Sequence, residues 1–204
     1  MILAIDTSTA ACSAAVFDDG GACLASRDEL IGRGHSERLV PMLGELLEGR
    51  RADRILVGVG PGSFTGIRVG LAAAQGLAIA WNCELHGMSS LALLAATANA
   101  GEGTVAAAVY GGHGELFVQQ FDAASLEPRS ELLNLPPDEA ARAMQAPLVV
   151  GPGAAALVEA RTSGEAREGW PSARHALTLP EALRTLAPRP IYARAPDARA
   201  MDAA

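Results

Sequence analysis

The segment from Gly58 to Gly70, with the sequence GVGPGSFTGIRVG, constrains the fold of this chain more than any other stretch. It begins at the end of an apolar, β-branched run at residues 54–58 that predicts a strand, and it leads into a helix predicted over residues 64–80. Glycines at such a junction allow the backbone to approach another group closely. The free N–H groups at the start of the helix, together with the positive end of its dipole, could also contact an anion.

The spacing of these glycines does not match a known phosphate-binding motif. No Lys-Ser or Lys-Thr pair follows them, so the segment is not a P-loop, and it does not fit the pattern GxGxxG. A phosphate contact at the turn around Gly60 and Gly62 is therefore one interpretation. The other interpretation is that the small residues serve packing.

Packing explains more of the predicted helix. Small residues recur at every fourth position, at Gly66, Gly70, Ala74 and Ala78. Such a row predicts a smooth ridge on which another helix can pack at short distance. Nearly all the other residues of the helix are apolar or small, so it needs cover on more than one side, and one sheet covers only one side. A neighbouring helix or a partner chain must therefore cover the other.

A second amphipathic helix is predicted over residues 36–48. Ser36 is its expected N-cap, and the apolar side chains that follow have the spacing of one helix face. We expect the two helices together to form a contact surface for another protein. The residues predicted for this surface are Leu39, Met42, Leu43, Leu46, Gly66, Gly70, Ala74 and Ala78.

The order of the predicted elements indicates an α/β fold with two similar halves. The strands of the first half are predicted at residues 2–5, 12–17, 22–30, 54–58 and 84–88. Those of the second half are predicted at residues 104–110, 115–122 and 148–150. Both halves begin with a hairpin and continue into helices and strands. We predict an N-terminal lobe at residues 1–100 and a smaller C-terminal lobe at residues 101–204, each resembling one lobe of an actin-like ATPase.

A carboxylate followed by hydroxyl groups ends the first predicted strand, in the run Asp6-Thr7-Ser8-Thr9. Asp6 and Ser8 could hold a hydrated Mg²⁺ and the terminal phosphates of a nucleotide. The alternative, which the sequence favours, is a turn in which both side chains bond nearby backbone N–H groups. The four histidines have neither HxxxH nor HExxH spacing, and no GxSxG occurs, so no metal site and no catalytic residue is predicted.

Charge and composition limit the partners of this chain. A net charge of −7 and the absence of a basic stripe make it a poor nucleic-acid binder by itself. Three widely spaced cysteines are expected to be reduced thiols. The first residues lack the basic region of a signal peptide, and the apolar stretch Val69–Trp81 is too short to span a bilayer. We therefore expect a cytoplasmic protein without membrane contact, with an extended and frayed end after Pro190-Ile191-Tyr192.

Three stretches of the chain are specific enough to identify a relationship. They are ILAIDTSTAACSAAVFDDGG, GRGHSERLVPMLGELL and VGVGPGSFTGIRVGLAAAQGLAIA, with a shorter echo, PIYARAPDA, near the end. With these stretches the chain resembles the TsaB (YeaZ) family, which supplies a subunit of the bacterial tRNA threonylcarbamoyladenosine (t6A) synthesis complex. The resemblance covers most of residues 1–95.

This resemblance implies a two-lobed actin-like (ASKHA) fold with duplicated mixed-sheet lobes. It also implies a non-catalytic scaffold that is not an enzyme on its own and that docks on a catalytic TsaD-type subunit through the helices at residues 36–48 and 64–80. A TsaE-type ATPase is expected to join this pair, and the chain alone is expected to form a homodimer through the same surface. It would reach tRNA only through the complex. No cofactor of its own is expected, although ATP or ADP with Mg²⁺ could bind at a shared site.

The chain departs from the family at the end of the first strand of the second half. Tyr110-Gly111-Gly112 stands where the family usually has Asp-Ala-Arg, so a carboxylate that could face a phosphate or metal is missing. This departure argues against the alternative function, an actin-like ATPase or small-molecule kinase that would use Asp6, Ser8, Gly60 and Gly62. A protease would need a metal or a nucleophile–base pair, and the sequence shows neither.

Overall fold

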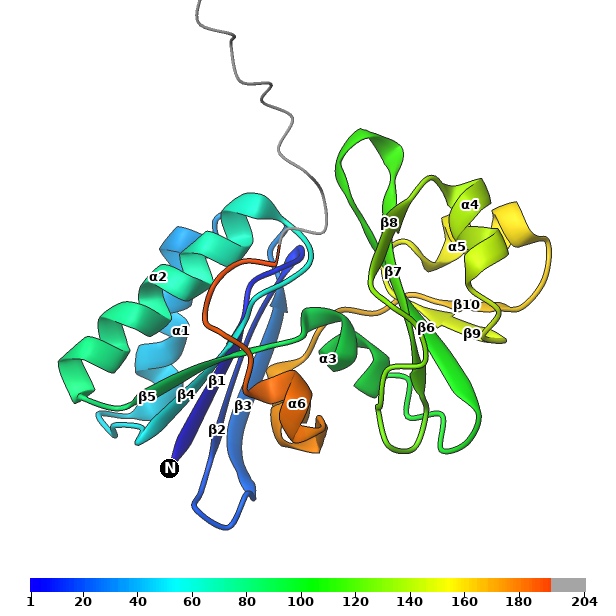
Figure 1. The fold of residues 1–204 in the computed structure, drawn as a ribbon. Coiled ribbons are helices and arrows are strands. Elements are labelled where there is room, and N and C mark those ends of the chain that lie inside the picture. The colour runs from blue at the N-terminus through cyan, green and yellow to red at the C-terminus, as the bar shows by residue number, and fades with distance from the viewer. Residues whose placement is uncertain (192–204) are drawn as a thin grey trace, which may run out of the picture.

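Ten strands form two five-stranded mixed sheets in the computed structural model, which describes residues 1–191 (Figure 1). The first sheet contains β1 (Ile2–Asp6), β2 (Ala11–Phe17), β3 (Cys23–Leu30), β4 (Arg54–Gly58) and β5 (Glu84–Met88). The second contains β6 (Thr104–Tyr110), β7 (Leu116–Asp122), β8 (Leu133–Leu135), β9 (Leu148–Val150) and β10 (Glu165–Arg167). The predicted extended end from Tyr192 onward lies outside the described residues.

The two sheets have the same topology. The first has the order β3-β2-β1-β4-β5, and the second, taken from its β8 edge, has the order β8-β7-β6-β9-β10. In each sheet the first three strands are antiparallel, and the last two continue parallel to the central strand. This repeated order is that of two actin-like lobes, so the predicted fold class is confirmed.

The helices cover the sheets and lie between them (Figure 1). They are α1 (His35–Leu47), α2 (Phe64–Trp81), α3 (Ser90–Ala96), α4 (Pro137–Ala143), α5 (Ala154–Arg161) and α6 (Glu181–Arg184), with short 3₁₀ turns at Gly112–Gly114 and Ala173–Thr178. The predicted N-cap of α1 was wrong. Gly34, with a φ of 90°, precedes the first helical residue, and the Ser36 hydroxyl donates to Glu37 instead of capping.

One face of the first sheet is covered by α1 and α2, and this packing corrects the predicted contact surface. The apolar face of α1 is fully inside the chain, with Leu39, Met42, Leu43 and Leu46 all buried. The four-residue ridge of α2 also points inward, with Gly66, Gly70 and Ala74 buried and Ala78 half-buried. A surface for another protein therefore cannot consist of these residues. At Gly66 and Gly70 the ridge packs on Thr7, in the turn that follows β1.

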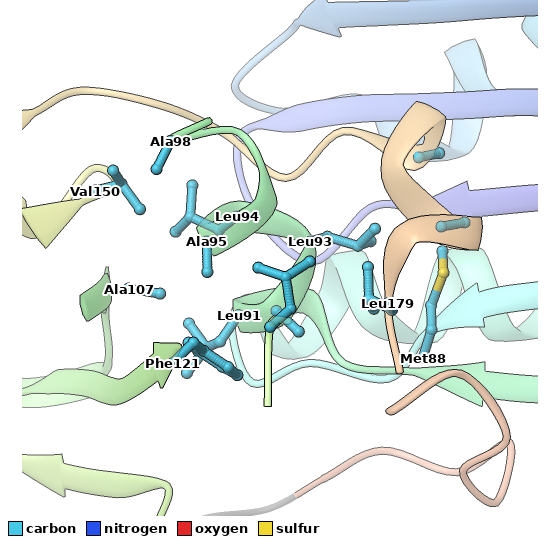
Figure 2. Packing of buried hydrophobic residues seen from close by; sticks show 14 of the residues in the cluster. Met88, Leu91, Leu93, Leu94, Ala95, Ala98, Ala107, Phe121, Val150 and Leu179 are labelled. Atoms are coloured by element: carbon cyan, nitrogen blue, oxygen red, sulfur yellow. The ribbon is translucent and has the colours of Figure 1, made fainter. Parts of the chain in front are cut away.

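The opposite face of the first sheet packs on α3, which also contacts the second sheet. Leu91, Leu93 and Leu94 of α3 are fully buried. Figure 2 shows them in one cluster with Phe121 and Val150 of the second sheet. A single hydrophobic core thus joins the two sheets through α3.

The chain returns to the first sheet after β10. Ala173, Ala176 and Leu179 join the α3 core, and Leu186 forms a bridge to Gly87 on the edge strand β5. The first sheet is therefore covered in part by residues beyond 170. The division into lobes at residues 1–100 and 101–204 stays a prediction.

The two sides of α2 give a direct test of this packing. A Cβ at Gly66 would clash with the carbonyl oxygen of Thr7, whereas a Cβ at Gly76 has no atom within 4 Å. We expect Gly66→Ala to lower the free energy of unfolding by roughly 2 kcal/mol or more. Gly76→Ala should raise it by about 1 kcal/mol, because alanine favours the helix. Urea unfolding of both variants measures this, and similar effects from the two substitutions would contradict the packing.

Candidate functional site

The turn after β1 and the glycine-rich segment form one closely packed unit. The Ser63 amide donates to the carbonyl of Ser8 at 2.6 Å, and the Thr7 hydroxyl donates to the carbonyl of Gly66 at 2.7 Å. A Cβ at Gly58 would clash with the carboxylate of Asp6, and a Cβ at Gly62 would clash with the carbonyl of Ser8. These glycines are therefore required by contacts within the chain.

The Asp6 carboxylate is buried and all of its interactions are internal. Its Oδ1 accepts hydrogen bonds from the amide and the hydroxyl of Ser8, at 2.9 and 2.7 Å. Its Oδ2 accepts from the Ser90 hydroxyl at 2.6 Å, and that hydroxyl accepts from the Gly60 amide at 3.1 Å. Burial raises the pKa of Asp6, while the hydrogen bonds from Ser90 and Ser8 act in the opposite direction. Asp6 thus bonds a nearby backbone N–H, as in the turn interpretation, but the Ser8 hydroxyl donates to Asp6 instead of accepting from the backbone.

A cavity of about 280 Å³ lies where the two lobes meet. Its lining includes Ser8 and Gly62 from the first lobe, Tyr110 and Pro152 from the second, and Trp170 from the returning segment. No Asp, Glu, Lys or Arg is among the described residues that line it. Any ligand would therefore be held by hydroxyl groups, backbone groups and aromatic side chains.

Only two of the four residues predicted for phosphate contact line this cavity. Ser8 and Gly62 line it, but Asp6 and Gly60 do not. Within residues 1–191, no group of three or more His, Cys, Asp and Glu side chains is placed to hold a metal ion. The assignment of these four residues to a phosphate site stays a prediction.

A second cavity, of about 400 Å³, lies at the N-terminal ends of α1 and α2. The residues that line it come from two segments, 32–36 and 63–69. In this region the Ser63 hydroxyl caps α2 by accepting from the Gly66 amide at 3.2 Å. This cavity was not predicted, because no residue pattern in either segment indicates that the two helices begin side by side.

The outer side of α2 is apolar and exposed. Phe64 is 57% exposed and Ile79 is 83% exposed, and Val40 on the neighbouring α1 is 65% exposed. The only charged residue in α2 is Arg68, whose guanidinium lies 3.5 Å from the centre of the Phe64 ring. The helix therefore presents a long apolar surface with one cation near its start.

Within residues 1–191, α2 is also the one helix whose length and composition would allow it to cross a membrane. Its 18 residues have a mean hydropathy of 1.2, and 28% of them are buried. The expectation that this stretch is too short considered only Val69–Trp81, but the helix begins at Phe64. The same composition suits a helix that packs on its own sheet with one side and is covered by another protein on the other.

These features place the chain in the class of two-lobed actin-like proteins. Its carboxylate turn is buried, and the outer side of its helix α2 is apolar and exposed. The family model of "TsaD: tRNA N6-adenosine threonylcarbamoyltransferase" matches residues 27–160, which is more than half of the chain. YeaZ from Pseudomonas aeruginosa is similar in structure, with a TM-score of 0.79 and 30% identity over 94% of this chain and 98% of that one. A second Pseudomonas aeruginosa structure, of an uncharacterized protein with similarity to peptidase YEAZ, has a TM-score of 0.78 and 32% identity over 95% of this chain and 99% of that one.

Curated relatives match over a shorter part of the chain. The tRNA threonylcarbamoyladenosine biosynthesis protein TsaB of Escherichia coli (strain K12) is 40% identical over 99 residues, which are 46% of this chain and 42% of that protein. The protein of the same name from Haemophilus influenzae is 40% identical over 102 residues, which are 48% and 42%. The match thus spans less than half the length of these relatives. The chain belongs to the TsaB (YeaZ) family, within the wider group that the TsaD model describes.

The buried carboxylate predicts an unusual pH dependence. Because burial raises the folded-state pKa of Asp6, the stability that its protonation contributes is present in acid and is lost as pH rises through that pKa. As pH rises from acidic to neutral, the unfolding temperature of the wild type should therefore fall relative to the unfolding temperature of Asp6→Asn at the same pH. Thermal unfolding from pH 4 to 8 measures this difference. Glu102→Gln, at an exposed position, is the control, and a difference between wild type and Asp6→Asn that does not change with pH would contradict the prediction.

Proposed function

We propose that this chain is a non-catalytic subunit of a t6A synthesis complex, which docks on a TsaD-type catalytic subunit through the outer sides of α1 and α2. The observation that carries the proposal is the exposed apolar side of α2, which has a single charged residue. The names of the Escherichia coli and Haemophilus influenzae relatives, TsaB of t6A biosynthesis, support the process.

The outward ridge of α2 supplies the kind of surface that a partner helix needs. Its residues are Arg68, Ala72, Gly76 and Ala80, and all four are exposed. They lie two positions along from the inward ridge, which is a rotation of about 200° around the helix. The row of small residues predicted from the sequence, at Gly66, Gly70 and Ala74, is buried, so the proposal uses this outward row instead. Close approach of a partner helix is possible over Ala72, Gly76 and Ala80 because their side chains are short.

Two glycines inside the helices are not required by packing among residues 1–191. A Cβ at Gly44 of α1 or at Gly76 of α2 would meet no atom within 4 Å. Each glycine costs about 1 kcal/mol of helix stability relative to alanine. A partner backbone that lies close to both positions would explain why the smallest residue stands there.

The cavity between the lobes supports a non-catalytic role. A hydroxyl nucleophile needs an adjacent base for group transfer, and no carboxylate, amine or imidazole is among the described residues that line this cavity. The Asp6 carboxylate is held by Ser8 and Ser90, and Tyr110 stands where the family usually has a carboxylate. Nucleotide with Mg²⁺ is therefore assigned, if anywhere, to a site shared with other subunits.

The remaining partners that we propose are those that the resemblance to the TsaB family implies. Two copies would pair through the α1–α2 face when the catalytic subunit is absent, and a TsaE-type ATPase would join the complex. With a net charge of −7, the chain would reach tRNA only through its partners in the cytoplasm.

Co-purification with the TsaD-type protein of the same organism tests the docking. We expect the wild type to co-elute in size exclusion, and Gly76→Leu and Ile79→Glu each to weaken the affinity by about tenfold or more, because both substitutions disrupt the centre of the interface. Isothermal titration calorimetry measures the dissociation constants. Leu24→Glu, at a 50% exposed position on β3, is the matched control and should bind as the wild type does.

Two results would reject this function. One is the absence of any complex with the wild-type chain. The other is equal binding by the α2 variants and the Leu24→Glu control. Thermal unfolding of each variant separates loss of the interface from loss of the fold.

A further inference from the structure

The cavity at the N-terminal ends of α1 and α2 is lined by a cationic side chain, although the protein as a whole is acidic. Its polar lining includes Arg33, His35, Ser36, Ser63 and Thr65. No Asp or Glu is among the described residues that line it, while the chain as a whole has a net charge of −7. Arg33 is thus the one formally charged side chain among the described residues that line the cavity.

The side-chain cation at this cavity is available to a ligand. Arg33 lies between two glycines in the left-handed conformation, Gly32 and Gly34, and it is exposed. It takes part in none of the ion pairs formed within residues 1–191. Glu37, in the first turn of α1, does not line the cavity, and its carboxylate accepts a hydrogen bond from Ser36 at 2.8 Å.

The backbone adds to the positive electrostatic potential in this cavity. Both α1, with 13 residues, and α2, with 18 residues, begin at this cavity, so the positive ends of two helix dipoles point toward one place. Arg33 and the two helix ends therefore form a single positive region.

This positive region is continuous with the apolar surface. Val69 and Thr65 line the cavity and belong to α2, and the exposed Phe64 lies at the start of the same helix. A protein that covers the outer side of α2 would therefore also cover the cavity. Any group that it inserts there would be removed from water, which strengthens the interaction between opposite charges.

We infer that the partner subunit which docks on α1 and α2 places an acidic side chain in this cavity, where its carboxylate faces Arg33 and the two helix starts. This inference rests on the proposed function, and it specifies the chemistry of the partner. Charge complementarity carries it: a cationic cavity adjoining an apolar face fits a partner whose own apolar face carries a carboxylate at the matching position. The pair would select the correct partner and orient it.

Binding of the TsaD-type protein to charge variants, at 50 and 300 mM NaCl, tests the inference. We expect Arg33→Glu to weaken binding at least tenfold at low salt and to reduce the salt dependence, with a smaller effect from Arg33→Gln. The control is Arg142→Glu, an exposed residue of α4 in the second lobe, which changes the net charge equally and should not alter binding. Replacing the facing acidic residue of the partner by lysine should restore binding to Arg33→Glu.

The possible outcomes separate the inference from the proposed function. If the wild type does not bind the TsaD-type protein, both fail. A second outcome is that the wild type binds the TsaD-type protein and Gly76→Leu weakens this binding, while Arg33→Glu binds as tightly as Arg142→Glu. In that case the inference is overturned and the docking proposal stands. Titration of the isolated chain with inorganic phosphate tests a small anion as the occupant. Phosphate binding that Arg33→Gln abolishes, with unchanged partner binding, would also overturn the inference.

Discussion

The close contact between the turn at Asp6–Ser8 and the segment Gly58–Gly70 is the constraint on which the rest of the first lobe depends. The turn occupies the space that side chains would need at four of the five glycines, so the backbone of α2 lies directly on the end of β1. This contact fixes which side of α2 is buried. It therefore also fixes which side remains for a partner, and the outward row of small residues on α2 is a consequence of the same geometry.

The same contact links the carboxylate turn to the centre of the molecule. Asp6 accepts a hydrogen bond from Ser90 at the start of α3, and α3 contributes the leucines that join the two sheets in one core. The carboxylate at the end of β1 is therefore part of the internal framework of the chain, because Ser8 and Ser90 occupy its two oxygens.

Much of the fold could be predicted from the sequence because its strands are strongly apolar and bounded by turns. The predicted strands at residues 54–58, 84–88 and 104–110 agree with β4, β5 and β6. The strands β8 and β10 were missed because three residues give no detectable alternation, and they form only by pairing with β7 and β9. The buried side of α2 was predicted as the contact surface because small residues recur on both sides, and only the position of Thr7 distinguishes them. The cavity at the helix starts was missed because it depends on tertiary contact between distant segments.

The central claim is that the outer sides of α1 and α2 form the surface by which this chain joins a larger assembly. Hydrogen–deuterium exchange of the chain with and without the TsaD-type protein of the same organism tests this claim most directly. We expect slower exchange in peptides that cover residues 33–47 and 64–81, with no change in α4 and α5 of the second lobe. Unchanged exchange in α2, or protection confined to the second lobe, would contradict it.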